Sequence, residues 1–198
     1  MTTWQHPKTI LDSDELGLVL KWALAAPPDG AVFEFGSYAG GTALALAHAL
    51  RLSRNPRMVF ACDTFSGFPV DDTAGPYRAG DLKCAELPDA LSALQREIAA
   101  TPHLPLTLVV GPFSDTLYKL DVDTISFAFF DCDIRPSLEQ AWAFVQPRLD
   151  ELSIFAFHDY GYYECPAVKA FVDATVGPNY RYRHIDHLHN LAFFQVIA

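Results

Sequence analysis

The sequence predicts an α/β fold in which a mainly parallel sheet of seven strands carries helices on both faces and ends in a C-terminal antiparallel hairpin. Short apolar runs of strand length alternate with helical segments along the 198 residues, as in parallel sheets that are covered on both sides. The first run turns sharply into a helix through several glycines. The last two runs are joined by a short polar turn, which indicates the hairpin.

The elements follow a regular order along the chain. An amphipathic helix is expected over 14–26, because its apolar residues recur on one face and Pro27-Pro28-Asp29-Gly30 ends it. The other expected helices span 42–53, 87–100, 137–149 and 167–175, and the expected strands span 31–36, 58–62, 106–110, 125–130, 153–157, 180–185 and 191–197. No linker interrupts this order. Residues 1–198 are therefore predicted to form one domain, with 1–29 as an N-terminal helical segment and 30–198 as the core.

The composition narrows the class of partner. The formal net charge is −10 and the Lys and Arg residues are scattered, whereas phosphate binding needs basic clusters. Nucleic acid and anionic membrane are therefore not expected as main partners, and a small molecule is. Hydrophobic residues make up 51% and charged residues only 19%, so the surface is expected to carry an apolar lid or the subunit interface of a homo-oligomer.

The chain is expected in the cytoplasm. Residues 1–10 lack the charged-then-apolar pattern of a signal peptide, and no apolar run approaches the roughly 18 residues of a membrane span. Cys62, Cys84, Cys132 and Cys165 form no Cys-x-x-Cys pair, so reduced thiols are expected rather than disulfides or a zinc site.

The glycine turn after the first strand is the most informative motif. Glu34, Gly36 and Gly40 have the spacing Glu-x-Gly-x-x-x-Gly. A strand that turns into a helix in this way presents bare backbone N–H groups to a cofactor. The pyrophosphate-binding Gly-x-Gly-x-x-Gly needs a glycine at Tyr38, so a dinucleotide fits less well. The spacing instead resembles the first motif of S-adenosylmethionine-dependent methyltransferases, whose class I members have a Rossmann-like fold.

Polar residues stand where the later apolar runs stop, at the edge where open α/β sheets bind ligands. Asp63 ends the second run and can accept both hydroxyls of a ribose, although it also suits a turn or a helix cap. The fourth run ends at Asp131-Cys132-Asp133 and the fifth at His158-Asp159-Tyr160. These acidic strand ends are the candidate site.

Four ordered segments resemble the TylF family, the macrocin O-methyltransferase-like enzymes that methylate hydroxyls of natural-product sugars using Mg²⁺: 62–69, 111–117, 131–133 and 158–161. The resemblance implies that S-adenosylmethionine is the cofactor. It places the methionine part of the cofactor at Glu34, Gly36, Ser37 and Thr42, the ribose at Asp63, and the adenine at the segment with Gly111, Phe113 and Ser114. The further residues expected to bind the cofactor are Tyr38, Gly40, Thr64 and Phe65. It also implies that Asp131, His158 and Asp159 hold the metal and carry the catalysis, with Asp131 close to the cofactor as well.

A divalent cation at these side chains has a chemical purpose, because it lowers the pKa of a bound hydroxyl and orients it toward the methyl group. Hard cations such as Mg²⁺ take oxygen ligands. His158 stands where the family usually has an aspartate, and imidazole favours Mn²⁺, Fe²⁺ or Zn²⁺ over Mg²⁺. Two alternatives stay open: the aspartates cap helices and no metal binds, or His158 accepts the proton in a metal-independent enzyme. Asp131 is also a candidate general base, with Asp133 in reserve.

Together these features predict an S-adenosylmethionine-dependent O-methyltransferase that acts on a hydroxyl of a small molecule, a sugar or phenol of natural product biosynthesis. A nicotinamide-dependent oxidoreductase and a non-catalytic methyltransferase-like binding protein are the rivals. His158 and Arg135, which depart from the family pattern, keep the second rival open. The loop 71–80 fits a lid over the substrate and an ordinary surface loop equally well. In the hairpin, alternation places His184 on the face opposite to His187 and His189.

Overall fold

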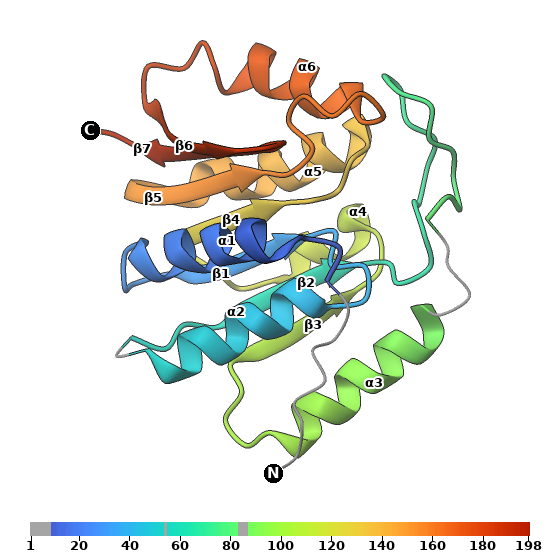
Figure 1. Ribbon diagram of the computed structural model, residues 1–198, viewed down its shortest axis with the longest axis vertical. Coiled ribbons are helices and arrows are strands. Elements are labelled where there is room, and N and C mark those ends of the chain that lie inside the picture. Colours follow the sequence, from blue (N-terminus) through green and yellow to red (C-terminus); the bar gives the residue numbers. More distant parts are fainter. Residues whose placement is uncertain (1–8, 54, 83–86) are drawn as a thin grey trace.

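The fold was obtained as a computed structural model that describes residues 9–53, 55–82 and 87–198. Its described residues form one seven-stranded sheet with the strand order β3-β2-β1-β4-β5-β7-β6 (Figure 1). The strands are β1 Ala31–Phe35, β2 Val59–Asp63, β3 Leu106–Val110, β4 Ile125–Phe130, β5 Leu149–Phe157, β6 Tyr182–Leu188 and β7 Leu191–Val196. Strands β1 to β5 pair in parallel, and β7 runs antiparallel to both β5 and β6. The predicted fold class is confirmed.

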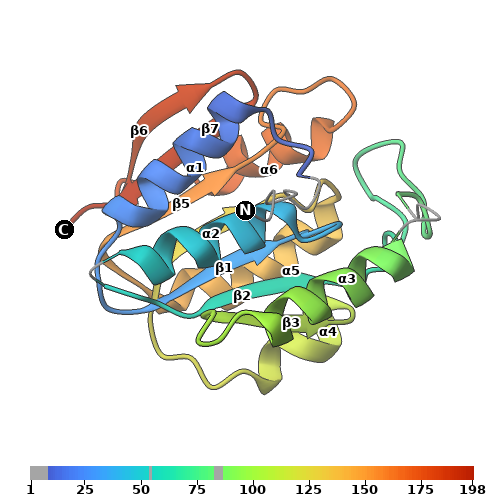
Figure 2. The ribbon, with the colours of Figure 1, turned by 60° about the horizontal axis from the view of Figure 1, so that its bottom comes forward.

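Helices cover both faces of the sheet (Figure 2). On one face lie α1 Ser13–Ala25, α2 Gly41–Leu52 and α3 Leu87–Ala100; on the other lie α4 Phe113–Thr116, α5 Arg135–Val145 and α6 Pro166–Thr175. Side chains of β4 alternate between the two layers, so that Phe127 and Phe129 pack toward α1 to α3 while Phe130 packs toward α4 to α6. Each layer buries its own apolar core against the sheet.

The first helix begins one residue earlier than the apolar pattern predicts, because Asp12 caps it. The Asp12 side chain accepts hydrogen bonds from the backbone N–H groups of Asp14 and Glu15, and the Glu15 side chain accepts from the Asp12 N–H in return. At the other end, the buried Arg57 donates to the carbonyl oxygens of Ala23 and Pro27. The carbonyls at the end of α1 therefore have partners inside the protein.

The hairpin corrects one expectation from the sequence. The pairing of β6 with β7 shifts between His184 and Asp186, so a bulge interrupts the alternation. The rings of His184 and His187 consequently lie 6.0 Å apart, and the prediction that they occupy opposite faces is wrong. The indole N–H of Trp22 in α1 donates to the Asp186 carboxylate at 2.8 Å, which holds the bulged segment in place.

Two more predictions from the sequence concern the cysteines and membrane-spanning helices. Cys62, Cys132 and Cys165 are buried and free, as predicted, whereas Cys84 lies outside the described residues. Within the described part of the chain, no helix has the length and apolar character needed to cross a membrane.

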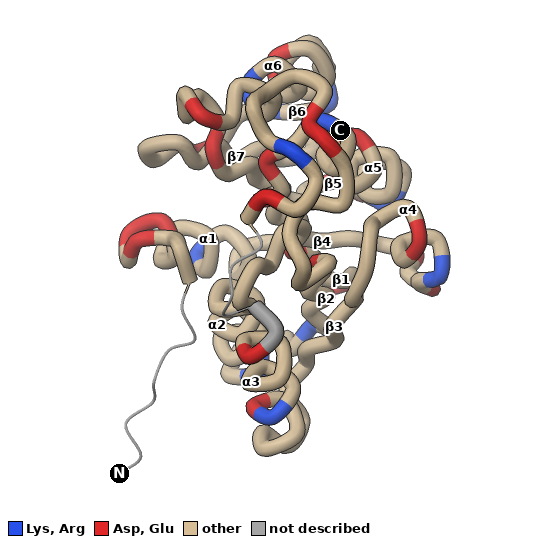
Figure 3. The backbone as a smooth tube through the Cα atoms, turned by 90° about the vertical axis from the view of Figure 1, so that its right-hand side faces the viewer, with Lys and Arg blue, Asp and Glu red and all other residues tan. Residues whose placement is uncertain are grey.

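The parallel strands all end at the same edge of the sheet, where β1 and β4 lie side by side. The chain leaves β1 toward β2 and β3 on one side and continues from β4 to β5 on the other, so this edge contains the point at which the strand order reverses. Ligands of open α/β sheets bind at such a point. Figure 3 looks onto this end of the molecule, over which acidic positions, drawn in red, are spread.

Candidate functional site

The turn after β1 requires glycine. Gly36 has φ +89°, and a Cβ atom there would lie 1.9 Å from the carbonyl oxygen of Asp131. The Gly36 N–H donates to the carbonyl oxygen of Cys62 at 2.9 Å. Gly40, with φ +79°, is the residue directly before α2, and a Cβ atom there would lie 2.3 Å from the Leu94 side chain. Backbone conformation and close packing therefore both account for the two glycines of the motif.

Asp63 joins the ends of the first two strands. One carboxylate oxygen accepts the Tyr38 N–H at 2.8 Å and the other accepts the Phe65 N–H at 2.6 Å. Burial raises the pKa of Asp63, even though these hydrogen bonds favour its charged form. Each oxygen keeps a lone pair for a further donor. The residue thus combines a structural role in both turns with the capacity to bind a diol.

Glu34 is a buried acid beside a very small cavity. Its side chain is 1% exposed, and burial raises its pKa to about 8. Among the described residues, Glu34 Oε2 and Ser37 Oγ have no aligned hydrogen-bond partner. Both residues line a cavity of about 20 Å³ together with Thr42 and Asp131, which is space for one water or one amino group. This cavity accommodates a small polar donor.

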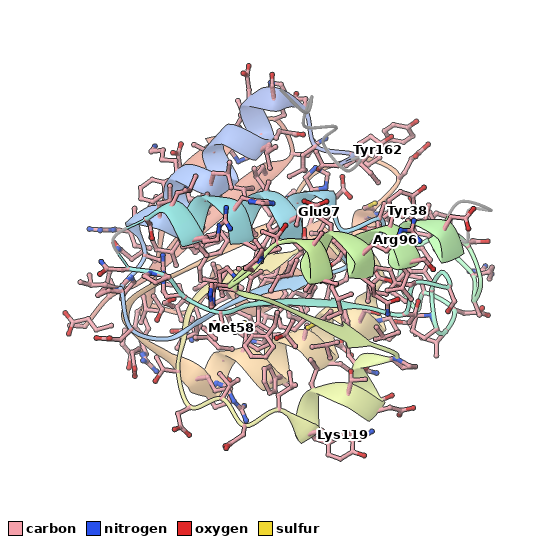
Figure 4. All side chains as sticks on the ribbon, turned by 90° about the horizontal axis from the view of Figure 1, so that it is seen from below. Tyr38, Met58, Arg96, Glu97, Lys119 and Tyr162 are labelled. Atoms are coloured by element: carbon pink, nitrogen blue, oxygen red, sulfur yellow. The ribbon has the colours of Figure 1, made fainter. Side chains whose placement is uncertain are left out.

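A larger cavity of about 340 Å³ opens at the strand ends. Its lining includes eight of the predicted site residues: Gly36, Tyr38, Asp63, Thr64, Phe113, Asp131, His158 and Asp159. The rest of the lining is mainly contributed by the loops after β2, β4 and β5, and it includes Phe68, Leu82, Asp133 and Tyr162. Tyr38 and Tyr162 lie toward the same end of the molecule in Figure 4. Such a size and a largely apolar wall are typical of a small-molecule site.

Three side chains that can ligate a metal ion meet at this cavity. His158 Nδ1 lies 2.9 Å from Asp131 Oδ1 and 3.3 Å from Asp159 Oδ2, and atoms of all three lie within 4.8 Å of one another. Burial by itself lowers the pKa of His158, but the two carboxylates outweigh burial and raise it to about 11. Without a metal, the imidazole is protonated at neutral pH and cannot accept a proton.

Asp133, the reserve candidate for the general base, lies beside other carboxylates at this cavity. Burial and the neighbouring carboxylates of Asp131 and Asp159 raise the pKa of Asp133 well above its usual value. Burial also acts to raise the pKa of Asp159, but hydrogen bonds from His158 and Asp133 outweigh it and lower that pKa. A raised pKa favours the protonated form of Asp133, which is able to donate a hydrogen bond to the neighbouring Asp159 carboxylate.

Some predicted cofactor residues do not line the large cavity. Phe65 is buried in the core on the α1 to α3 side. Ser114 is exposed and its hydroxyl lies 2.9 Å from the Asp115 carboxylate, while the Gly111 N–H donates to the Asp63 carbonyl oxygen. Of the segment predicted to hold adenine, Phe113 is the residue that faces the cavity.

The site also contains residues that the sequence analysis missed. Tyr162, Glu164 and Ile10 line the cavity, and Glu15 Oε1 lies 3.8 Å from His158 Nε2. A signal for Glu15 exists in the spacing Asp12-x-x-Glu15, which is typical of a capping box, but it indicates only a helix start.

A comparison with protein families gives a match over residues 33–160 to the family described as a methyltransferase domain. This chain belongs to the methyltransferase domain family. The matched segment of this methyltransferase runs from β1 to the end of β5 and contains Glu34, Asp63, Asp131, His158 and Asp159. A search of curated proteins gave no match.

Solved structures similar to this methyltransferase share its fold. The O-methyltransferase NovP has 21% identity and a TM-score of 0.72, over 96% of this chain and 82% of the other. The calicheamicin methyltransferase CalS11 has 21% identity and a TM-score of 0.69, over 91% and 76%. The O-methyltransferase TomG of Streptomyces achromogenes, solved with S-adenosylmethionine, has 14% identity and a TM-score of 0.63, over 97% and 83%. The protein is thus a class I, S-adenosylmethionine-dependent methyltransferase, and the oxidoreductase alternative is set aside.

Proposed function

We propose that this methyltransferase transfers a methyl group from S-adenosylmethionine to a hydroxyl of a small molecule, a sugar or a phenol, in the manner of the macrocin-type enzymes and with a divalent ion. The observation that carries the proposal is the meeting of Asp131, His158 and Asp159 at the large cavity, next to the glycine turn. NovP and TomG are described as O-methyltransferases, and CalS11 as a TDP-rhamnose 3'-O-methyltransferase, which supports oxygen as the acceptor atom.

The residues present fit the methyl donor. Glu34 offers a buried carboxylate oxygen without an aligned partner to the amino group of the methionine part. Asp63 keeps one lone pair on each oxygen for the ribose hydroxyls. Gly36 leaves the backbone of the turn open to the cofactor, because no Cβ stands there. Asp131 lines both cavities and would therefore face the part of the cofactor between these anchors.

The donor set also fits a divalent ion. Ligand atoms bound about 2.1 Å from an ion lie about 3 Å apart when they are at right angles, close to the 2.9 and 3.3 Å that separate His158 Nδ1 from its two carboxylate neighbours. His158 Nδ1 lies next to both carboxylates, so its lone pair becomes available to an ion once the imidazole loses its proton. Asp131, Asp159 and His158 would hold the ion, and a bound ion lowers the pKa of the acceptor hydroxyl. Because the ion needs neutral imidazole, its binding competes with the proton on His158.

Residues of the chain itself supply proton transfer, exclusion of water and positioning. Asp131 accepts the proton of the acceptor hydroxyl while the oxygen attacks the methyl carbon and the bond from carbon to sulfur breaks, which leaves S-adenosylhomocysteine. Phe68, Phe113 and Tyr162 exclude water from the reacting groups. Holding both reactants at one place accounts for most of the expected rate enhancement, because methyl transfer needs an in-line approach.

The experiment combines binding and turnover. Wild-type protein is incubated with S-adenosylmethionine and two probes, catechol and methyl rhamnoside, with Mg²⁺, with Mn²⁺ or with EDTA, and S-adenosylhomocysteine and methylated probe are measured by mass spectrometry. We expect O-methylated product from at least one probe and a loss of turnover in EDTA. Binding of S-adenosylmethionine without product from either probe would contradict the proposed acceptor class, and turnover that EDTA leaves unchanged would contradict the metal.

A further inference from the structure

The loop between β2 and α3 crosses the site edge of the sheet. Its described part, residues 64–82, is called the β2 loop here. It folds back on itself, since the Phe68 N–H donates to the Asp81 carbonyl oxygen, the Gly80 N–H to that of Phe68, and the Asp72 N–H to that of Tyr77. Figures 1 and 2 both show it running from the end of β2 toward α6. The loop therefore forms a compact unit that spans from one half of the sheet to the other.

Asp72 attaches this loop to the opposite half of the molecule. Its side chain is buried, with 7% exposure, and Oδ1 accepts the N–H of Arg135 at 2.9 Å as well as that of Ala74 at 3.1 Å. Arg135 is the first residue of α5, and the residue before it, Ile134, has no side chain that can cap a helix. The carboxylate of a residue 63 positions earlier thus supplies the missing cap and meets the positive end of the helix.

Two further contacts show how closely the loop is seated. A Cβ atom on Gly75 would lie 2.3 Å from Asp72 Oδ2 and 3.6 Å from the side chain of Pro166, so glycine allows this close approach. The hydroxyl of Tyr77 lies 3.7 Å from Cys165 Sγ, directly before α6. An ordinary surface loop turns its charged side chains to water, whereas here a carboxylate is buried against a helix end.

The seated loop forms one wall of the large cavity. Gly67, Phe68 and Leu82 line that cavity, and the Phe68 ring packs against Tyr77 at 5.2 Å. On the other side of the cap, α5 contributes Ser137 to the lining. The bond from Arg135 to Asp72 therefore connects two walls of the space where the acceptor is proposed to bind.

We propose that Asp72 is a positioning residue that holds the β2 loop as a wall of the acceptor space by capping α5. The proposal rests on the proposed function for the identity of that space. The negative charge is secondary, because the contact needs an oxygen acceptor at the Oδ1 position. Asp72→Asn should therefore keep the wall in place, Asp72→Ala should release it, and Thr73→Ala, an exposed neighbour in the same loop, serves as control.

Trypsin offers a test that needs no acceptor. Arg78 is the single basic residue of 64–82, so cleavage after it reports opening of the β2 loop. We expect Asp72→Ala to be cut at Arg78 about tenfold faster than wild type, the effect of losing the side-chain cap of a helix. Asp72→Asn and Thr73→Ala should be cut at the wild-type rate. Equal cleavage rates for Asp72→Ala and wild type would overturn the role of Asp72 in holding the loop. Cleavage of Asp72→Asn as fast as that of Asp72→Ala would overturn it as well.

Kinetics distinguish positioning from a merely structural role. With the probe that wild type methylates, Asp72→Ala should raise KM about tenfold. Its kcat and its affinity for S-adenosylhomocysteine, measured by calorimetry, should stay within about twofold, because Asp63 and Asp131 lie outside the loop. A fall in kcat with unchanged KM would contradict the role. If wild type methylates neither probe, the proposed function fails while the trypsin result still decides the anchor. Circular dichroism, together with uncut sites elsewhere in the chain, shows that Asp72→Ala is folded.

Discussion

A Cβ atom on Gly36 would lie 1.9 Å from the carbonyl oxygen of Asp131, so the glycine turn proposed to bind the cofactor rests directly on the strand end that carries the proposed proton acceptor. The two groups come from β1 and β4, which are neighbours in the sheet although they are far apart in the sequence. In the proposed function, this contact would bring methyl donor and hydroxyl acceptor together through the backbone itself.

Asp63→Ala should weaken binding of both S-adenosylmethionine and S-adenosylhomocysteine by about tenfold or more, because hydrogen bonds from ribose to a carboxylate are lost. The variant also frees the N–H groups of Tyr38 and Phe65, so its fold is checked by circular dichroism. Calorimetry measures the affinities, with Asp115→Ala, an exposed aspartate outside the cavity lining, as control. Unchanged affinity in folded Asp63→Ala would remove the ribose assignment.

Asp131→Asn should cut turnover by about 10² or more while cofactor affinity changes only a few-fold, since the amide can neither accept the hydroxyl proton nor ligate a cation as well. The side chain keeps its shape, which limits the effect on the glycine turn. Single-turnover kinetics with saturating S-adenosylmethionine measure the step. Near-normal turnover would mean that the aspartate has only a structural role at the end of β4.

His158→Asp should raise the affinity for Mg²⁺ relative to Mn²⁺ and Zn²⁺, because carboxylate suits the harder ion. In the metal-free wild type the imidazole, with a pKa of about 11, is protonated at pH 7.5. Metal must displace that proton, so wild-type affinity should rise between pH 7.5 and 9, and the variant should lack this rise. Metal titrations at both pH values, with exposed His103→Asp as control, measure it. The same preference and pH dependence in wild type and His158→Asp would show that His158 does not touch the ion.

Glu34→Gln should remove a pH-dependent part of the stability of the cofactor-free protein. The pKa of Glu34 is about 8 in the fold against 4.5 ordinarily. A raised pKa stabilises the fold below pH 4.5, and this contribution is lost as the pH rises toward 8. The unfolding free energy of wild type minus that of Glu34→Gln should therefore fall over this range, measured in urea at pH 5, 6.5 and 8. Exposed Glu151→Gln is the control, and a constant difference for Glu34→Gln would contradict the burial argument.

Local signals in the sequence were enough for most elements. The helix over 87–100 and the strands over 106–110 and 125–130 have the predicted bounds. By contrast, β5 begins at Leu149, four residues before the expected start, because polar Asp150 and Glu151 hide the strand and Leu152 has φ +68°. The short helix α4 was not predicted, since a single turn has no periodicity to recognise.

By itself, the sequence determined the sheet of alternating elements, the glycine turn and the acidic strand ends, because each depends on residues that are neighbours along the chain. Tertiary structure alone decided which distant residues meet at the site, such as Glu15 beside His158 and Asp72 on the first N–H of α5. It also decided the bulge within β6 that places His184 beside His187. Tertiary structure likewise decides the protonation of His158, because burial and two neighbouring carboxylates set the pKa of its imidazole. The contacts of Glu15 and Asp72 join segments that are far apart along the chain, and no local pattern encodes a distance between such segments.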